Sequence, residues 1–144
     1  MLLDVALSFL HFTFAFILVG ALSAEAFVLR LPVDERVARL LLRIDLFYGL
    51  AAVGLIVAGV CRVFFSPAGA AYYAGQPFFW AKMAVFVVIG IISIWPTRAF
   101  LGWVKHGPPD EAEVKRIKRL VMAELHILVL VVLFAALMAR GGGL

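Results

Sequence analysis

A histidine inside a membrane-length apolar run is the first residue of this chain whose type and position could support chemistry. His11 lies within an almost unbroken apolar stretch from Leu2 to Leu29, and a run of about 18 or more apolar residues can cross a bilayer as a helix. An ionisable side chain at that depth costs at least about 2.5–3.5 kcal/mol, so it usually faces the interior of a helix bundle. We predict that His11 is a haem or metal ligand. A proton relay and a hydrogen-bonded packing histidine remain open alternatives.

Three further side chains could act together with His11. Lys82 lies about one turn into a later apolar run, and Arg62 lies at the end of an earlier one. At about 1.5 Å per helical residue, His11 lies roughly 13 Å and Lys82 roughly 7 Å below the outer surface. Because a buried carboxylate needs a charged partner, Lys82 and Arg62 are candidates to bind haem propionates, although Lys82 could also extend to the interface. His126, roughly 8 Å deeper than His11, is the candidate second axial or metal ligand.

A second group of polar residues lies nearer the opposite interface, and it contains Glu25, Asp45, Tyr48, Arg98 and Glu124. Charges near an interface are inexpensive and pair readily. The simplest prediction is therefore a set of interhelical ion pairs, in which Arg98 binds Glu25 or Glu124. Asp45 would pair with Arg43 in the same way.

The composition indicates what must hold these side chains. The chain has 144 residues, of which 65% are hydrophobic and 15% charged, whereas soluble domains are about 45–50% apolar and 25% charged. We predict an all-α membrane protein, a four-helix transmembrane bundle that forms a single domain over residues 1–144. Pro96 is expected to kink or end the third helix. The predicted helices cover about residues 2–29, 44–65, 77–101 and 110–139.

Basic residues predict the orientation of this bundle. The link after the first helix carries four Lys and Arg residues and the segment from Arg98 to Arg119 carries six, whereas the second link has only the flanking Arg62 and Lys82. Cytoplasmic loops are enriched in Lys and Arg. Both termini are therefore predicted to be periplasmic, in a multi-pass protein of the bacterial inner membrane.

Several classes of function are excluded by missing motifs. The sequence has no nucleophile elbow, no Gly-rich phosphate loop and no His-Glu-x-x-His motif, so soluble-type hydrolase and nucleotide chemistry are not expected. Its one cysteine, Cys61, cannot form a disulfide within the chain. The basic segment from Lys115 to Arg119 lies beside a membrane helix, so we expect it to contact anionic lipid and not nucleic acid.

The chain resembles an uncharacterised family of predicted bacterial inner-membrane proteins, the domain of unknown function 2214, over nearly its whole length. It is more distantly similar to HemJ-type protoporphyrinogen IX oxidases and to the membrane part of CopD-type copper-resistance proteins. The residues that carry the resemblance are His11, Arg43 to Gly49, Arg62 to Phe64, Trp80 to Lys82 and Met138 to Gly141.

The oxidase resemblance implies a b-type haem. That family has a histidine in its first helix and a tryptophan and a lysine in its third, which match His11, Trp80 and Lys82 here. Its fourth helix carries an Asn-Glu pair, and this chain departs from it with Ala123-Glu124. The resemblance thus supports haem binding more directly than oxidase activity.

The leading hypothesis is a b-type haem-binding redox protein, and an oxidoreductase acting on a porphyrin or a quinone is the form of it that we consider. The alternative is a cofactor-free accessory subunit of a larger membrane complex. A copper-related transport component ranks third, because Met83, Met122 and Met138 are not expected at the depth of His11, although copper favours such soft ligands. The expected partners are the lipid bilayer and a redox or complex partner within it, and a homo-oligomer is left open.

Overall fold

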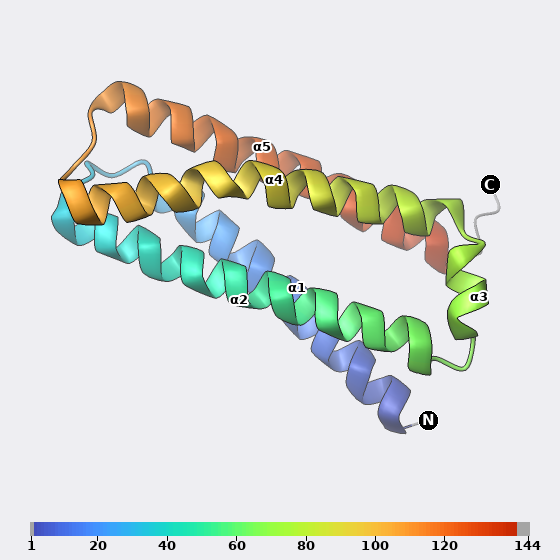
Figure 1. Ribbon diagram of the computed structural model, residues 1–144. Coiled ribbons are helices and arrows are strands. Elements are labelled where there is room, and N and C mark those ends of the chain that lie inside the picture. The colour runs from blue at the N-terminus through green and yellow to red at the C-terminus, as the bar shows by residue number, and fades with distance from the viewer. Residues whose placement is uncertain (1, 141–144) are drawn as a thin grey trace.

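The computed structural model describes residues 2–140 and contains only helices over this range. Four of its helices are long and apolar enough to cross a membrane, which confirms the all-α fold class predicted from the sequence. A short fifth helix, α3, joins the second and third of them (Figure 1). The helices are α1 (Leu2–Val28), α2 (Glu35–Phe65), α3 (Gly69–Ala74), α4 (Pro77–His106) and α5 (Glu111–Ala139).

The second helix begins nine residues earlier than the predicted start at residue 44, since α2 starts at Glu35. Asp34 is its N-cap and accepts a hydrogen bond of 2.8 Å from the backbone N–H of Val37. The segment that follows is rich in Leu, Ala and Arg, which are good helix formers. Ala38 and Leu41 are fully buried in this segment. Most of the polar link between the first two predicted helices is therefore part of α2 and packs into the bundle.

Of the two outcomes predicted at Pro96, a kink or the end of the third helix, the helix end does not occur. The helix α4 continues through Pro96 to His106, and the proline is itself buried. Proline is tolerated inside membrane helices because neighbouring helices and Ser or Thr side chains compensate for the lost backbone hydrogen bond. The ten residues beyond Pro96 include Phe100 and Trp103, which are buried and pack edge to face.

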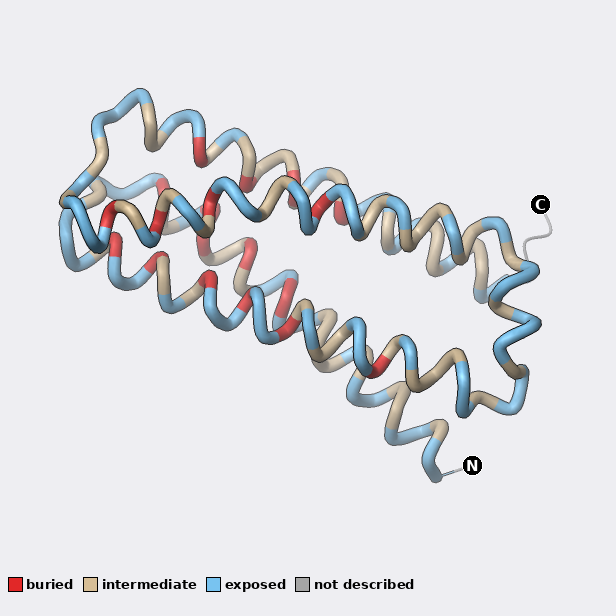
Figure 2. Tube along the Cα trace, viewed as in Figure 1, coloured by how far each residue is buried: buried red, intermediate tan, exposed pale blue. Residues whose placement is uncertain are grey.

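The long helices are arranged as two hairpins, α1 with α2 and α4 with α5 (Figure 1). The hairpins converge at the end that carries the α1–α2 and α4–α5 connections, and they separate towards the end that carries α3. Figure 2 shows that the buried positions gather in the converged half. Leu18, Leu22, Ile117 and Val121 form part of this core.

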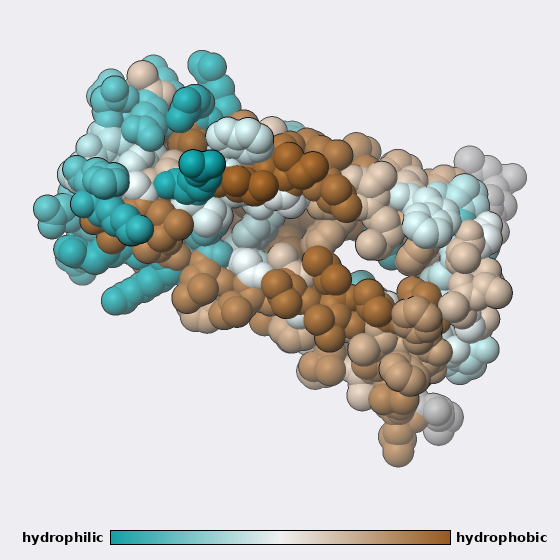
Figure 3. Space-filling model, in the orientation of Figure 1, coloured by the Kyte–Doolittle hydropathy of each residue, from teal (hydrophilic) through white to brown (hydrophobic). Residues whose placement is uncertain are grey.

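Most of the remaining surface of the long helices is apolar, while hydrophilic residues gather at the converged end (Figure 3). Large side chains such as Phe16, Phe47 and Val129 are exposed on the outside of the bundle. An apolar exterior around helices of this length is the surface that lipid covers. Both the start of α1 and the end of α5 lie at the α3 end of the molecule (Figure 1).

Candidate ligand pocket between the two hairpins

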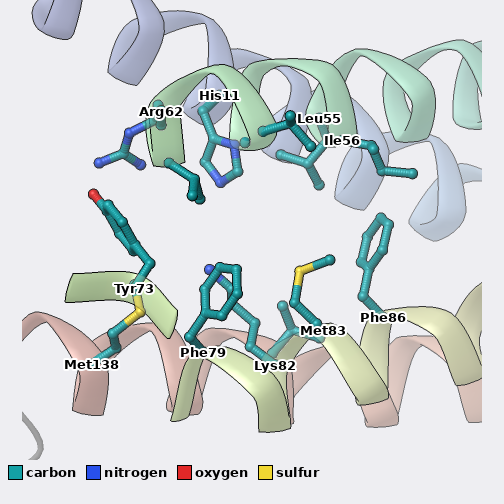
Figure 4. A pocket seen from close by; sticks show the side chains of 14 residues that line it. His11, Leu55, Ile56, Arg62, Tyr73, Phe79, Lys82, Met83, Phe86 and Met138 are labelled. Atoms are coloured by element: carbon teal, nitrogen blue, oxygen red, sulfur yellow. The ribbon is translucent and has the colours of Figure 1, made fainter. Parts of the chain in front are cut away.

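A pocket lies between the hairpins in the half where they separate. Its open space is about 750 Å³ when the part open to the exterior is included. Figure 3 shows the molecule hollowed between α2 and α4 next to α3. The pocket is lined by His11, Leu55, Ile56, Gly59, Val60, Arg62, Val63, Tyr73, Phe79, Lys82, Met83, Phe86, Val131 and Met138 (Figure 4).

His11 reaches the pocket across a glycine of α2. A Cβ atom at Gly59 would lie 3.3 Å from Cε1 and 3.5 Å from Nδ1 of the imidazole, so glycine leaves the space that the ring uses. Nδ1 is buried in this contact, without a hydrogen bond of good geometry, and the Leu55 backbone is its polar neighbour. The other ring nitrogen points into the pocket (Figure 4). That nitrogen is free to bind a ligand.

Two cations face the same space. Arg62 and Lys82 are the charged neighbours of His11, and both line the pocket from opposite hairpins (Figure 4). The Lys82 Nζ atom lies 5.5 Å from the centroid of the Phe79 ring, and the Arg62 Cζ atom lies 6.0 Å from that of Phe12. No carboxylate lines the pocket, and the Arg62 Nε atom is buried without a hydrogen-bond partner within residues 2–140. The pocket is therefore electropositive and suits an anion.

The remaining pocket walls are apolar, aromatic or sulfur-containing. Met83 on α4 and Met138 on α5 line the same space as His11 (Figure 4). The sequence-based prediction that these methionines lie apart from His11 in depth is wrong. The depth estimate assumed helices that run perpendicular to the membrane and have known ends, whereas the two hairpins diverge and are inclined to one another.

Tyr73 and Gly59 are pocket residues that the sequence analysis missed. Tyr73 enters from α3 and points towards the opening beside Arg62 (Figure 4). No signal in the sequence pointed to it, because the helix α3 that carries Tyr73 was not predicted. Trp80 on α4 is linked to α3 next to the pocket, since its indole N–H donates a 3.0 Å hydrogen bond to the Ala74 carbonyl.

His126 is not part of the site. Its side chain is exposed on the outside of α5, and its Nδ1 atom lies 2.6 Å from the Met122 carbonyl oxygen one turn earlier. The structure thus does not bring His126 together with His11. This geometry does not fit the prediction that His126 is the second axial or metal ligand. Within residues 2–140, no group of three or more His, Cys, Asp or Glu side chains is arranged to hold a metal ion.

The ion pairs predicted for the second polar group do not form. Arg43 and Arg98 are exposed, and over the described part of the chain the ion pair that does form joins Arg39 and Glu35 on the surface of α2. Arg98 follows the buried Pro96 on α4 but points away from the core. A residue next to a membrane helix end can reach water, which explains why these cations leave the carboxyl groups unpaired.

The fold and the pocket together define a multi-pass α-helical membrane protein with a ligand-sized cavity between two helical hairpins. A family model described as "Predicted membrane protein (DUF2214)" matches residues 3–143, and the chain belongs to this family. Neither a curated protein nor a solved structure gives a match. The more distant similarity to HemJ-type oxidases and CopD-type membrane domains stays a prediction from the sequence.

Proposed function

We propose that this protein binds b-type haem in the pocket between its hairpins and acts as a redox protein of the bacterial inner membrane. The observation that carries the proposal is the combination of a pocket-facing imidazole from His11 with two unpaired cations, Arg62 and Lys82, in otherwise apolar walls. Haem has the same combination of properties, since it is a flat apolar macrocycle with an iron that imidazole binds and two carboxylates at one edge.

The residues of the pocket divide into three roles under this proposal. His11 would hold the iron through its pocket-facing nitrogen, while Gly59 and the Leu55 backbone lie behind the ring. Lys82 and Arg62 would bind the propionates. Phe79 and Phe86 contribute apolar walls that exclude water. Bound haem would supply one-electron transfer to a membrane-soluble porphyrin or quinone.

The experiment is to purify the protein in detergent after growth with haem precursor and to measure Soret absorbance per protein. We expect the wild type to carry haem and His11→Ala to lose it. Lys82→Ala should bind haem more weakly or alter its redox potential. His126→Ala is the matched control, because it removes the same kind of side chain from outside the pocket and should leave the spectrum unchanged.

Two results would contradict the proposal. Wild-type haem content in His11→Ala would show that this imidazole is not an essential ligand. A colourless wild type under the same growth conditions would favour the alternative of a cofactor-free accessory subunit.

One observation keeps copper as a second candidate. Met83, Met138 and His11 line one pocket, and thioether and imidazole together are suitable ligands for Cu(I). Metal analysis of protein purified after growth with copper tests this directly. Copper that is lost in Met83→Leu, a change of nearly equal volume, would support a copper site, whereas copper-free wild type would eliminate it.

A further inference from the structure

Three carboxyl groups from three different helices lie inside the converged half of the bundle. Glu25 on α1 and Glu124 on α5 are each 1% exposed, and Asp45 on α2 is 6% exposed. The charged neighbours of Glu25 are the other two carboxyl groups. This acidic cluster is separate from the His11 pocket, whose lining contains none of the three.

Hydroxyl groups satisfy part of this cluster and leave the rest unpaired. Tyr48 on α2 donates a 3.1 Å hydrogen bond to Oε2 of Glu124, and Thr97 on α4 donates a 3.0 Å hydrogen bond to Oδ1 of Asp45. The Oε1 atoms of Glu25 and Glu124 are buried without any hydrogen-bond partner within residues 2–140. Each of the four long helices thus contributes an acid or a hydroxyl, and none contributes a base.

Such a cluster must be neutralised by something that is not a side chain of this chain. Burying an ionised carboxylate without a partner is so costly that the group takes up a proton instead, and carboxylates that share a site cannot all be ionised. A metal ion is the other way to neutralise them, but these carboxyl groups are not among any set arranged to hold a metal within residues 2–140. The arrangement therefore favours a proton over a metal ion.

We propose that Glu25 is a proton-binding residue, whose carboxyl group holds an exchangeable proton at neutral pH inside the acidic cluster. The proposal does not depend on haem binding, because it rests on burial and missing counter-charges in the opposite half of the molecule.

A second cavity reaches the edge of the cluster. It lies between α2 and α4, with an open space of about 740 Å³ including the part open to the exterior, and it is lined by Asp45, Tyr48, Ser93 and Thr97 among others. Tyr48 lines this cavity and donates its hydrogen bond to Glu124, and Glu124 is one of the two carboxyl neighbours of Glu25. Hydroxyl and protonated carboxyl groups both donate and accept hydrogen bonds, so these groups are the ones available to exchange a proton with Glu25.

The test is infrared spectroscopy of the full chain in detergent at neutral pH. A protonated carboxyl group has a C=O stretching band that an ionised one lacks. We expect this band in the wild type, a shift of the band in deuterated water, and its loss in Glu25→Gln. Glu124→Gln should shift the band, since it changes the neighbour. Glu111→Gln, which changes an exposed carboxyl group in the first turn of α5, should leave it unaltered.

A measurement on the wild type keeps the proposal testable even if the variants fail to fold. Labelling glutamate side-chain carboxyl carbons with ¹³C must shift the band if it arises from Glu25, whatever the variants do. A wild type without a glutamate C=O band at neutral pH would overturn the proposal. A band that appears only after sodium, potassium and divalent ions are removed would also overturn it, because a cation would then occupy the cluster.

Discussion

The interiors of the two halves of the bundle contain opposite kinds of ionisable side chain and are packed in opposite ways. Around His11 the hairpins separate, and Arg62 and Lys82 face an open pocket without a carboxylate. Around Glu25 the hairpins converge, and three carboxyl groups lie in a tight core without a base. Within a membrane, burying an unpaired charge is costly. Under our two proposals each half is completed from outside, the open one by an anionic ligand and the packed one by a proton.

Helix periodicity links the two regions. His11 and Glu25 are 14 residues apart on α1, and Tyr48 and Arg62 are 14 residues apart on α2. Fourteen residues correspond to nearly four turns, or about 21 Å, so each helix presents one polar residue to each region from the same face. Ile56 and Phe86 line both cavities and form the apolar connection between the two regions.

The prediction with the largest expected effect concerns membrane topology, that is, which half of the bundle faces the periplasm. The distribution of Lys and Arg predicts that the α3 end, and with it the His11 pocket, is periplasmic. A reporter that is active only in the periplasm should therefore give a signal when fused after Leu144 and none when inserted at Pro108. The reverse pattern would mean that the cationic pocket opens to the cytoplasm and the acidic cluster lies near the periplasm.

The next effect tests the difference in packing. Phe100 in the converged half is fully buried against Trp103, so Phe100→Ala should lower the free energy of unfolding by about 3 kcal/mol through the cavity it leaves. Phe86 borders the open pocket, and Phe86→Ala should cost about 1 kcal/mol or less, because its neighbours already lack contacts on one side. Thermal unfolding in detergent measures both. Equal losses would mean that the two halves are equally well packed.

Much of this fold could be predicted from the sequence, because the membrane constrains it strongly. Four long apolar runs must become helices, since lipid offers no partner for the backbone. The helix starts were harder to predict, although Asp34 and Asp110 cap α2 and α5 with their side chains. Pro96 does not end its helix, because in a membrane bundle neighbouring helices and Ser or Thr side chains compensate for the lost backbone hydrogen bond.

The candidate site could be predicted only in part. His11, Lys82 and Arg62 stand out as charges in apolar runs, and the structure brings all three to one pocket. The rotation of each helix about its axis is not encoded in depth, and this rotation turns His126 outward and brings Met83 and Met138 to His11. The same applies to Arg98, whose direction decides whether Glu25 has a partner. Depth estimated along upright helices is therefore a weak guide to which residues meet, because helix inclination and rotation decide it.

A smaller effect tests the hydrogen bonds of the acidic cluster. Tyr48→Phe keeps the ring but removes the hydroxyl that donates to Glu124, so a buried carboxyl oxygen loses its donor. We expect a loss of about 1–2 kcal/mol in the free energy of unfolding. In the background of Glu124→Leu, where no carboxyl group remains to be satisfied, the same change should cost much less. Equal costs in the two backgrounds would show that the hydroxyl stabilises the protein through some other group.

The smallest effect concerns the contact that fixes His11. Gly49 and Gly59 both lie inside α2, but a Cβ atom at Gly49 would meet no atom within 4 Å, whereas one at Gly59 would press on the His11 ring. Replacing glycine by alanine inside a helix stabilises it by about 0.5–1 kcal/mol, so Gly49→Ala should raise the midpoint of thermal unfolding slightly. In Gly59→Ala the same gain should be offset, since the imidazole must move by a few tenths of an ångström. If haem occupies the pocket, this movement should also alter Soret absorbance in Gly59→Ala and leave Gly49→Ala like the wild type. An equal rise in both midpoints with unchanged absorbance would mean that His11 does not rest against Gly59.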